Sequence, residues 1–157
     1  MYIKGVEFES FCNYYKPSMF IAFPNCSFKC DKECGQQVCQ NCALAAAPSV
    51  DADVLDLIAA YNRNNITESV VCSGLDPMDS WDDLIDFIRK FRYATQDDVV
   101  IYTGYKEEEI ADKIEILKEI PNIVIKFGRY IPDRPKRYDT ILGVTLASDN
   151  QYARRIS

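Results

Sequence analysis

Five of the seven cysteines lie in one short segment, "CSFKCDKECGQQVCQNC", which runs from Cys26 to Cys42. Thiolates at such short spacing can bind zinc or an iron–sulfur cluster. Only Cys39 and Cys42 have the CxxC spacing that is typical of zinc sites, whereas Cys26, Cys30 and Cys34 follow one another at steps of four. The spacing by itself leaves both kinds of metal centre open.

The composition narrows the chemistry of this segment. An odd number of cysteines cannot all pair, and 157 residues can bury a core without cross-links, so a disulfide framework is disfavoured. The chain has no histidine, which excludes mixed Cys/His zinc sites and Cys–His nucleophile pairs. Cys12 and Cys72 stand alone in the sequence, and isolated cysteines usually act as small core residues or free thiols.

The charge and hydropathy of the sequence indicate which large partners the protein attracts and in which compartment it is found. A net charge of −6 and a pI near 4.7 predict no general attraction to nucleic acids or to anionic membranes. The first residues, "MYIKGVEFESF", do not resemble a signal peptide, and no apolar run is long enough to cross a bilayer. These patterns predict a cytoplasmic protein, and in that compartment a cysteine cluster is more often a metal or redox site than a disulfide framework.

The apolar periodicity predicts which elements position the cysteines. Strands are expected at residues 18–24, 66–72, 98–103, 122–127 and 140–146. Apolar residues at helical spacing predict helices at 51–62, at 80–91 and at 110–117, with Ser49 or Asp51 as the N-cap of the first helix. Strands that alternate with helices indicate βαβ units, and therefore a single α/β domain over residues 1–157 with a mainly parallel sheet.

A parallel sheet also predicts where a site would lie. Ligands of such sheets bind at the carboxyl edge of the strands, in the loops that lead into the following helices. Three unusual segments follow predicted strands: the cysteine segment, "SGLDPMDS" at 73–80 and "TGYKEE" at 103–108. We therefore expect these three segments to meet at one rim of the sheet.

With these motifs in this order, the chain resembles the radical S-adenosylmethionine (SAM) enzymes, and more closely the anaerobic ribonucleoside-triphosphate reductase activating proteins. The first half of that family's CxxxCxxC motif matches Cys26 and Cys30, and its end matches the Cys-Gln-Asn sequence at Cys39. Eight residues, "DKECGQQV", separate Cys30 from Cys39 where the family has two, so Cys34 competes as the third ligand. The Gln-Asn context favours Cys39, and the role of Cys42 is open.

Later segments resemble the family in the same order. "SGLDP" is similar to its Gly-Gly-Glu-Pro segment, "YTGY" at 102–105 to its Tyr-Thr-Gly-Tyr strand end, and "ASDNQ" at 147–151 to its closing Gly-Ser-Ser-Asn-Gln. In "FGRY", Phe127 stands where the family has an acid. The resemblance implies an open partial (β/α) barrel with a mainly parallel sheet, as in a small radical SAM core.

The resemblance also implies cofactors and residue roles. Cys26, Cys30 and Cys39 would hold a [4Fe-4S] cluster whose open iron binds SAM. Asp76 would accept a hydrogen bond from the ammonium group of SAM. The residues that would bind this cofactor are Gln40, Asn41, Gly74, Asp76, Tyr102 and Thr103. Ser148, Asn150 and Gln151 would border SAM or the partner protein.

The function implied by the resemblance is that of an enzyme, a radical SAM oxidoreductase that activates another protein. It would cleave SAM reductively to a 5′-deoxyadenosyl radical and generate a glycyl radical on the large subunit of anaerobic ribonucleotide reductase, with an electron donor such as flavodoxin. Two alternatives stay open. One is another small radical SAM enzyme that resembles 7-carboxy-7-deazaguanine synthase, and the other is a non-catalytic four-cysteine zinc module that binds protein partners.

Overall fold

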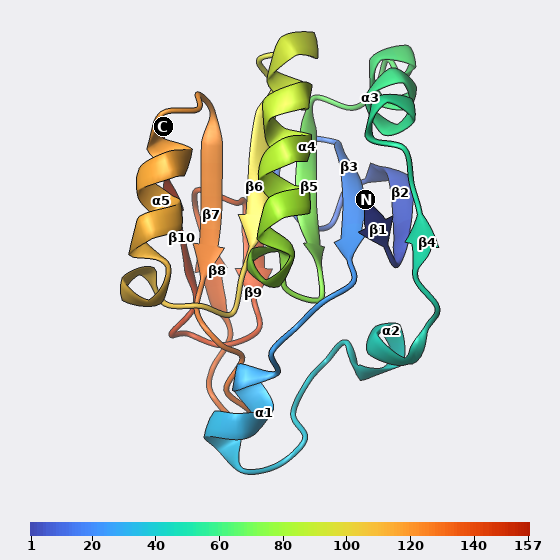
Figure 1. The fold of residues 1–157 in the computed structure, drawn as a ribbon. Coiled ribbons are helices and arrows are strands. Elements are labelled where there is room, and N and C mark those ends of the chain that lie inside the picture. Colours follow the sequence, from blue (N-terminus) through green and yellow to red (C-terminus); the bar gives the residue numbers. More distant parts are fainter.

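The computed structural model describes residues 1–157 and has a mixed α/β fold built on a six-stranded sheet (Figure 1). Its strands are β2 (Gly5–Ser10), β3 (Ser18–Phe23), β5 (Ser69–Gly74), β6 (Asp98–Tyr102), β7 (Ile123–Phe127) and β10 (Tyr152–Arg155). The order is β10-β7-β6-β5-β3-β2; the four central strands are parallel, and β2 and β10 pair antiparallel at the edges. The predicted α/β class with a mainly parallel sheet is confirmed, whereas the open partial barrel stays a prediction.

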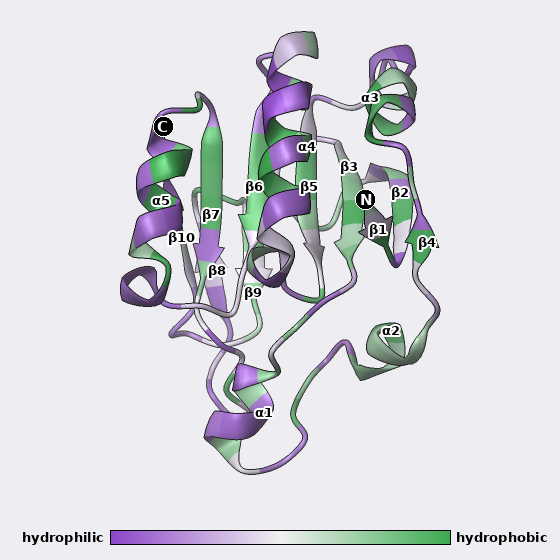
Figure 2. Ribbon diagram, in the orientation of Figure 1, coloured by the Kyte–Doolittle hydropathy of each residue, from purple (hydrophilic) through white to green (hydrophobic).

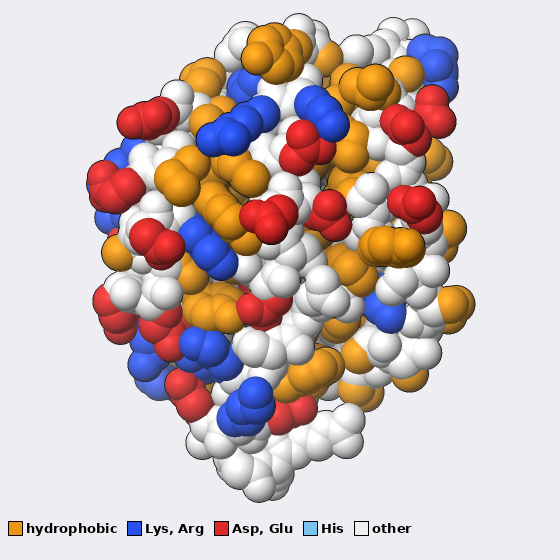
Figure 3. All heavy atoms as spheres, viewed as in Figure 1, with side chains coloured by type: hydrophobic (Ala, Val, Ile, Leu, Met, Phe, Trp, Pro, Cys, Tyr) orange, Lys and Arg blue, Asp and Glu red, His pale blue; other side chains and the backbone are white.

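Three helices connect the parallel strands and cover one face of the sheet (Figure 1). They are α3 (Val54–Arg63), α4 (Trp81–Ala94) and α5 (Ala111–Lys118), and the short 3₁₀ helices η1 (Pro77–Ser80) and η2 (Glu107–Glu109) precede α4 and α5. The strands are largely hydrophobic, and the helices carry both hydrophobic and hydrophilic residues (Figure 2). The outer surface on this side carries acidic and basic side chains in alternation rather than a field of one sign (Figure 3).

The local sequence explains these elements. The runs of β-branched residues in β5, β6 and β7 are fully buried because the sheet is covered on both faces. The start of α3 corrects the predicted N-cap: the side chain of Asp53, not Ser49 or Asp51, accepts hydrogen bonds from the amides of Leu55 and Asp56. The reason is tertiary, since Val50–Asp51 forms strand β4 and pairs with β1 (Tyr2–Ile3).

A second layer covers the other face of the sheet. It combines residues 11–17, the two-stranded ribbon of β8 (Arg137–Asp139) and β9 (Val144–Leu146), and the turn between these strands. The buried residues of this layer are Tyr14, Leu142 and Leu146, and they form one hydrophobic cluster with Val71, Val100, Val124 and Ala153 of the sheet. The predicted strand 140–146 is therefore too long: only Val144–Leu146 is a strand, and it pairs with β8 rather than with the main sheet. The reason is that Asp139 accepts hydrogen bonds from the amides of Ile141 and Leu142 and closes a turn there.

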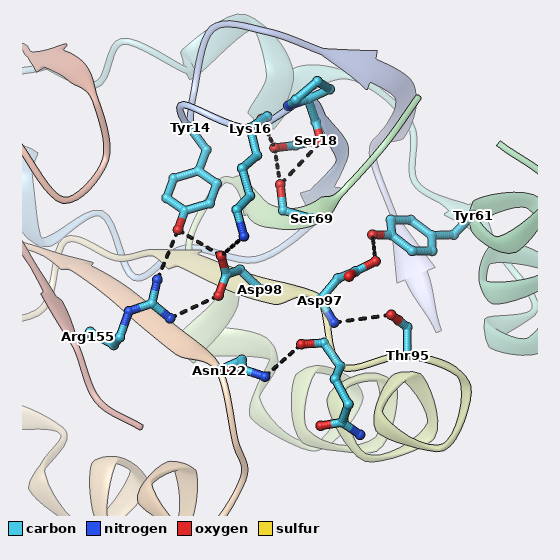
Figure 4. Close-up of polar contacts among 12 residues, drawn as sticks. Tyr14, Lys16, Ser18, Tyr61, Ser69, Thr95, Asp97, Asp98, Asn122 and Arg155 are labelled. Atoms are coloured by element: carbon cyan, nitrogen blue, oxygen red, sulfur yellow. Dashed lines mark hydrogen bonds and ion pairs between the residues drawn. The ribbon is translucent and has the colours of Figure 1, made fainter. Parts of the chain in front are cut away.

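A polar cluster around Asp98 joins this layer to the sheet (Figure 4). The carboxylate of Asp98 accepts from Tyr14 Oη at 3.0 Å, Lys16 Nζ at 2.6 Å and Arg155 Nη1 at 2.9 Å. Burial by itself would raise the pKa of Asp98, but the hydrogen bonds from Arg155 and Lys16 outweigh it and lower the pKa. The cluster thus fastens residues 11–17 and the C-terminal strand to β6.

The segment between β3 and β4 lies beyond the carboxyl edge of the sheet (Figure 1). It contains the short helices α1 (Lys29–Cys34) and α2 (Cys42–Ala46), neither of which has a buried residue. Lys4 Nζ donates to the carbonyl oxygens of Ala45 and Ala47 and so fastens the end of α2 to the N-terminal part of the chain. None of the helices has the length and apolar character that crossing a bilayer requires.

Candidate metal centre

A cavity of about 260 Å³ opens at the carboxyl edge of the parallel strands. Its walls come from the three loops that were predicted to share this edge, from the end of β7 and from residues 144–151. All nine predicted site residues line it: Cys26, Cys30, Cys39, Gln40, Asn41, Gly74, Asp76, Tyr102 and Thr103. Cys34 and Cys42 are not among the lining residues. The structure therefore brings the predicted residues together, while their roles stay predictions.

The three predicted cluster ligands are partly buried. The backbone amide of Phe28 donates to Cys26 Sγ at 3.2 Å. Burial raises the pKa of Cys26 to about 12 and also raises the pKa of Cys30, and the charge of Cys39 adds to both shifts. The three thiols line the same cavity. A bound cation would favour their thiolate forms, as metal ligation requires.

The arrangement of the cysteines distinguishes a site for a single metal ion from a site for a cluster. No group of three or more His, Cys, Asp or Glu side chains lies close enough to hold a single metal ion. In a [4Fe-4S] cluster each thiolate binds a different iron, so the ligands stand farther apart than around one ion. Three thiols that line one cavity fit such a cluster, with Cys26, Cys30 and Cys39 as the residues that would hold it.

Ion pairs fasten helix α1 to the rest of the rim. The guanidinium of Arg129 binds both carboxylate oxygens of Glu109, at 2.8 and 2.6 Å, and lies 3.0 Å from Glu33 of α1. Lys29, also on α1, lies 3.3 Å from Glu109. The hydrogen bonds from Arg129 lower the pKa of Glu109 to about 2. The bidentate pair orders Arg129 and Glu109, and their ion pairs with Glu33 and Lys29 fasten the cysteine segment to them.

Asp76 lies at the floor of the cavity and is only 5% exposed. Its Oδ1 accepts from the amide of Met78 at 3.1 Å, and its Oδ2 accepts from the amide of Gly104 at 2.9 Å. Thr103 Oγ1 donates to the same carboxylate and lies 2.8 Å from Oδ1 and 3.0 Å from Oδ2. Burial raises the pKa of Asp76 to about 6, although these hydrogen bonds oppose the shift. A carboxylate offers about four lone-pair positions, so with three donors the carboxylate of Asp76 keeps room for one more.

Gly104 leaves a gap between Asp76 and Cys30. A Cβ built on Gly104 would lie 3.6 Å from Asp76 Oδ2, 3.7 Å from Cys30 Sγ and 4.0 Å from Arg129 Cγ. All three distances are ordinary van der Waals contacts, so an alanine would fit and the fold does not require glycine at this position. The gap is therefore space that a ligand could occupy beside a cysteine sulfur and a carboxylate.

Gly74 has a different reason to be glycine. Its φ of +85° is a left-handed conformation, and an added Cβ would lie 2.7 Å from the Cα of Ala22 on the neighbouring strand β3. The structure thus gives Gly74 a packing reason to be glycine, and its part in binding a cofactor stays a prediction. The carbonyl oxygen of Gly74 accepts from Asn41 Nδ2 at 2.6 Å, so Asn41 fixes the cysteine segment to the end of β5, and Gln40 beside it is exposed.

Lys126 is a cavity residue that the sequence analysis missed. It lies near the end of β7, is 7% exposed, and donates from Nζ to the carbonyl oxygen of Gly128 at 3.0 Å. Burial lowers its pKa to about 8, and the charges of Asp76 and Cys30 oppose the shift. A sequence signal existed, because a lysine interrupts the apolar run "NIVIKF" of a strand that is buried along its whole length.

Residues 12–13 and residues near the C-terminus also line the cavity. Tyr102 Oη donates to the backbone oxygen of Asn13 at 2.6 Å, which brings residues 11–17 to the cavity. Cys12 lines the cavity and is exposed, whereas Cys72 is fully buried in the main core. Gln151, in the segment that resembles the family's end, is buried and lines the cavity.

A comparison with protein families agrees with this chemistry. Residues 17–151 match the model of a family described as "4Fe-4S single cluster domain". No significant similarity to a curated protein or to a solved structure was found. Because the match spans most of the chain and includes all the cavity cysteines except Cys12, the chain belongs to the 4Fe-4S single cluster domain family of iron–sulfur proteins.

Proposed function

We propose that the protein is a cytoplasmic radical SAM activase, which generates a glycyl radical on the large subunit of anaerobic ribonucleotide reductase. The observation that carries the proposal is the composition of one cavity. It combines the three predicted ligand cysteines with the acidic Asp76, the basic Lys126 and the gap at Gly104 between the acid and Cys30. An amino acid moiety bound beside a cluster needs an acceptor for its ammonium group and a donor for its carboxylate, and the cavity offers both.

When bound, the cluster and SAM supply the chemistry: an electron from a donor such as flavodoxin splits SAM into methionine and a 5′-deoxyadenosyl radical, which takes the Cα hydrogen of a glycine. The protein's part is to bind, orient and shield. Three thiolates would leave one iron of the cluster open for the amino and carboxylate groups of SAM, as the family resemblance implies. The partial barrel, as an open sheet, would leave the cavity accessible to the glycine loop of the partner.

The polar residues of the cavity suit the methionine moiety. The carboxylate of Asp76 has three donors for about four lone-pair positions, so it would accept one more, charge-assisted hydrogen bond from the SAM ammonium. Lys126 uses one of its three donors on Gly128, so the others are free for the SAM carboxylate. Thr103 acts through Asp76, whose carboxylate it holds in place.

The remaining predicted residues suit the adenosine side or shape the cavity. Asn41 fixes the cysteine segment to Gly74, and Gln40 extends this wall. Tyr102 is held by its hydrogen bond to the backbone of Asn13 and would flank the cofactor from β6. These residues would orient the bond of SAM that breaks without reacting themselves.

Electron paramagnetic resonance of the reconstituted, dithionite-reduced protein tests the proposal, recorded with and without SAM. We expect a reduced four-iron signal that changes shape when SAM is added, formation of 5′-deoxyadenosine, and a glycyl radical signal once the large reductase subunit is present. A four-iron signal that SAM leaves unchanged would refute the SAM assignment. SAM cleavage without a glycyl radical on that subunit would refute the activase assignment and favour another small radical SAM enzyme.

A further inference from the structure

The interval between the second and third predicted ligands is spanned by a helix and a return loop. Helix α1 contains Cys30 and Cys34 and ends at Gly35, whose φ of 67° turns the chain back. Cys34 lies about 6 Å farther along the helix axis than Cys30, because an α-helix rises about 1.5 Å per residue. This helix leads away from the sheet edge (Figure 1), and Cys34 is not among the cavity residues. The loop 35–39 must therefore carry Cys39 back to the cavity.

Asp31 holds this return loop. Its Oδ1 accepts from the backbone amide of Val38 and from that of Cys39, each at 2.8 Å. These are the only hydrogen bonds of the Asp31 side chain, and it forms no ion pair. One carboxylate oxygen thus fastens the amide of Cys39 to the helical turn that carries Cys30.

We propose that Asp31 is the positioning residue that makes Cys39, rather than Cys34, the third ligand of the cluster. The proposal rests on the ligand set of the proposed function. Two amides that share one acceptor fix both the direction of the loop and the distance between the backbones at Cys30 and Cys39. A cluster needs that distance to be constant, since its thiolate ligands must be held at fixed separations. The position of the acceptor oxygen holds the loop, and the negative charge of Asp31 contributes less.

Three substitutions separate geometry from charge. Asp31→Ala removes the acceptor, Asp31→Asn keeps an acceptor oxygen without the charge, and Asp31→Glu keeps the charge but moves the oxygens by one methylene. Lys32→Ala is the matched control, because Lys32 is the next residue of α1, is exposed and forms no ion pair. All variants are reconstituted anaerobically as the full chain, and the rate of iron loss to a chelator is measured beside amide hydrogen exchange of residues 36–41.

We expect Asp31→Ala and Asp31→Glu to lose iron about tenfold faster than the wild type and to exchange the amides of Val38 and Cys39 faster, because the two hydrogen bonds are lost or misplaced. Asp31→Asn should stay within about threefold of the wild type, as an amide oxygen accepts less strongly than a carboxylate. Lys32→Ala should match the wild type. The Asn and Glu variants keep the test decisive if the Ala variant does not fold.

Two outcomes overturn the inference in distinguishable ways. If Asp31→Ala loses iron at the wild-type rate, Asp31 does not position the loop. The same follows if Asp31→Glu loses iron at the wild-type rate while Asp31→Asn loses it rapidly, because charge rather than geometry would then matter. In both cases the proposed cluster and its ligands would be unaffected. A full, stable cluster in Cys39→Ala would refute the proposed ligand set, and the role of Asp31 with it.

Discussion

Replacing Gly104 with alanine should weaken SAM binding without harming the fold. The methyl group would enter the gap that separates Asp76 Oδ2 from Cys30 Sγ, at 3.6 and 3.7 Å from these atoms. Neither distance requires a neighbour to move, and the φ of Gly104 lies outside the left-handed region. The substitution therefore changes the space available to a ligand and little else.

The expected magnitudes follow from this geometry. A Gly→Ala substitution at a compatible backbone position stabilises a protein by about 0.4–1 kcal/mol, because the unfolded chain loses conformational freedom. In the loaded site, a methyl group forced into a packed contact costs about 1–3 kcal/mol. That cost corresponds to a Kd for SAM that is raised by a factor of about 5 to 150. Stability and affinity should thus change in opposite directions.

Isothermal titration of SAM into the reconstituted protein measures the affinity, and thermal unfolding measures the stability. Gly74→Ala is the contrasting control, because its Cβ would meet the Cα of Ala22 at 2.7 Å and its φ is +85°. A non-glycine residue in such a conformation costs about 1–3 kcal/mol even without the clash. Gly74→Ala should therefore lower the melting temperature, whereas Gly104→Ala should not.

Two results would refute the reasoning about Gly104. The first is an unchanged Kd for SAM in a folded Gly104→Ala protein that carries its full iron content, because the gap would then not be part of the SAM site. The second is a melting temperature that falls as far as in Gly74→Ala, because the gap would then be needed for folding rather than for a ligand.

Three further predictions concern the ligands, the cavity acid and the polar cluster behind the sheet. Cys39→Ala should abolish cluster formation and Cys34→Ala should not, as measured by iron content after reconstitution; the reverse pattern would make Cys34 the third ligand. Asp76→Asn should lower the affinity for SAM about ten- to hundredfold, since a hydrogen bond to a charged group contributes about 1.5–3 kcal/mol. Because burial raises the pKa of Asp76 from 3.8 to about 6, its ionisation costs stability above pH 6 and this cost disappears below pH 3.8. In denaturant unfolding of the metal-free protein, the wild type should therefore gain about 2 kcal/mol relative to Asp76→Asn as the pH falls from 7 to 4; a pH-independent difference would contradict the raised pKa. The pKa of Asp98 is lowered, so its stabilising contribution is present above the ordinary pKa of 3.8 and is lost as the pH falls below that value. Asp98→Asn should lower the free energy of unfolding by only about 1–2 kcal/mol at pH 7, because Lys16 and Arg155 are exposed enough for water to solvate their charges in the variant. The variant should also lack the loss of stability that the wild type shows in acid. If the variant still loses stability in acid, another group is responsible.

Local patterns were sufficient for the parts of this protein that local forces decide. Runs such as "DVVIY" predicted strands because β-branched residues pack well in a buried sheet, and the spacing of Leu84, Ile88 and Phe91 predicted α4. The parallel order then followed from the alternation of strands and helices, and with it the edge at which the three loops meet. The cysteine spacing and the order of the motifs were enough to indicate an iron–sulfur protein.

Only the tertiary structure decided which residues share the cavity beyond those motifs. Lys126 lines it although it belongs to none of the motifs. Cys12 also lines it, on a loop in which the hydroxyl of Tyr14 accepts a hydrogen bond from Arg155 near the C-terminus. The sequence also left Cys39 and Cys34 in competition, and the hydrogen bonds of Asp31 bring Cys39 to the cavity. Such contacts form where the folded backbone brings residues that are far apart in the sequence next to each other. They leave no periodic pattern in the sequence around either residue.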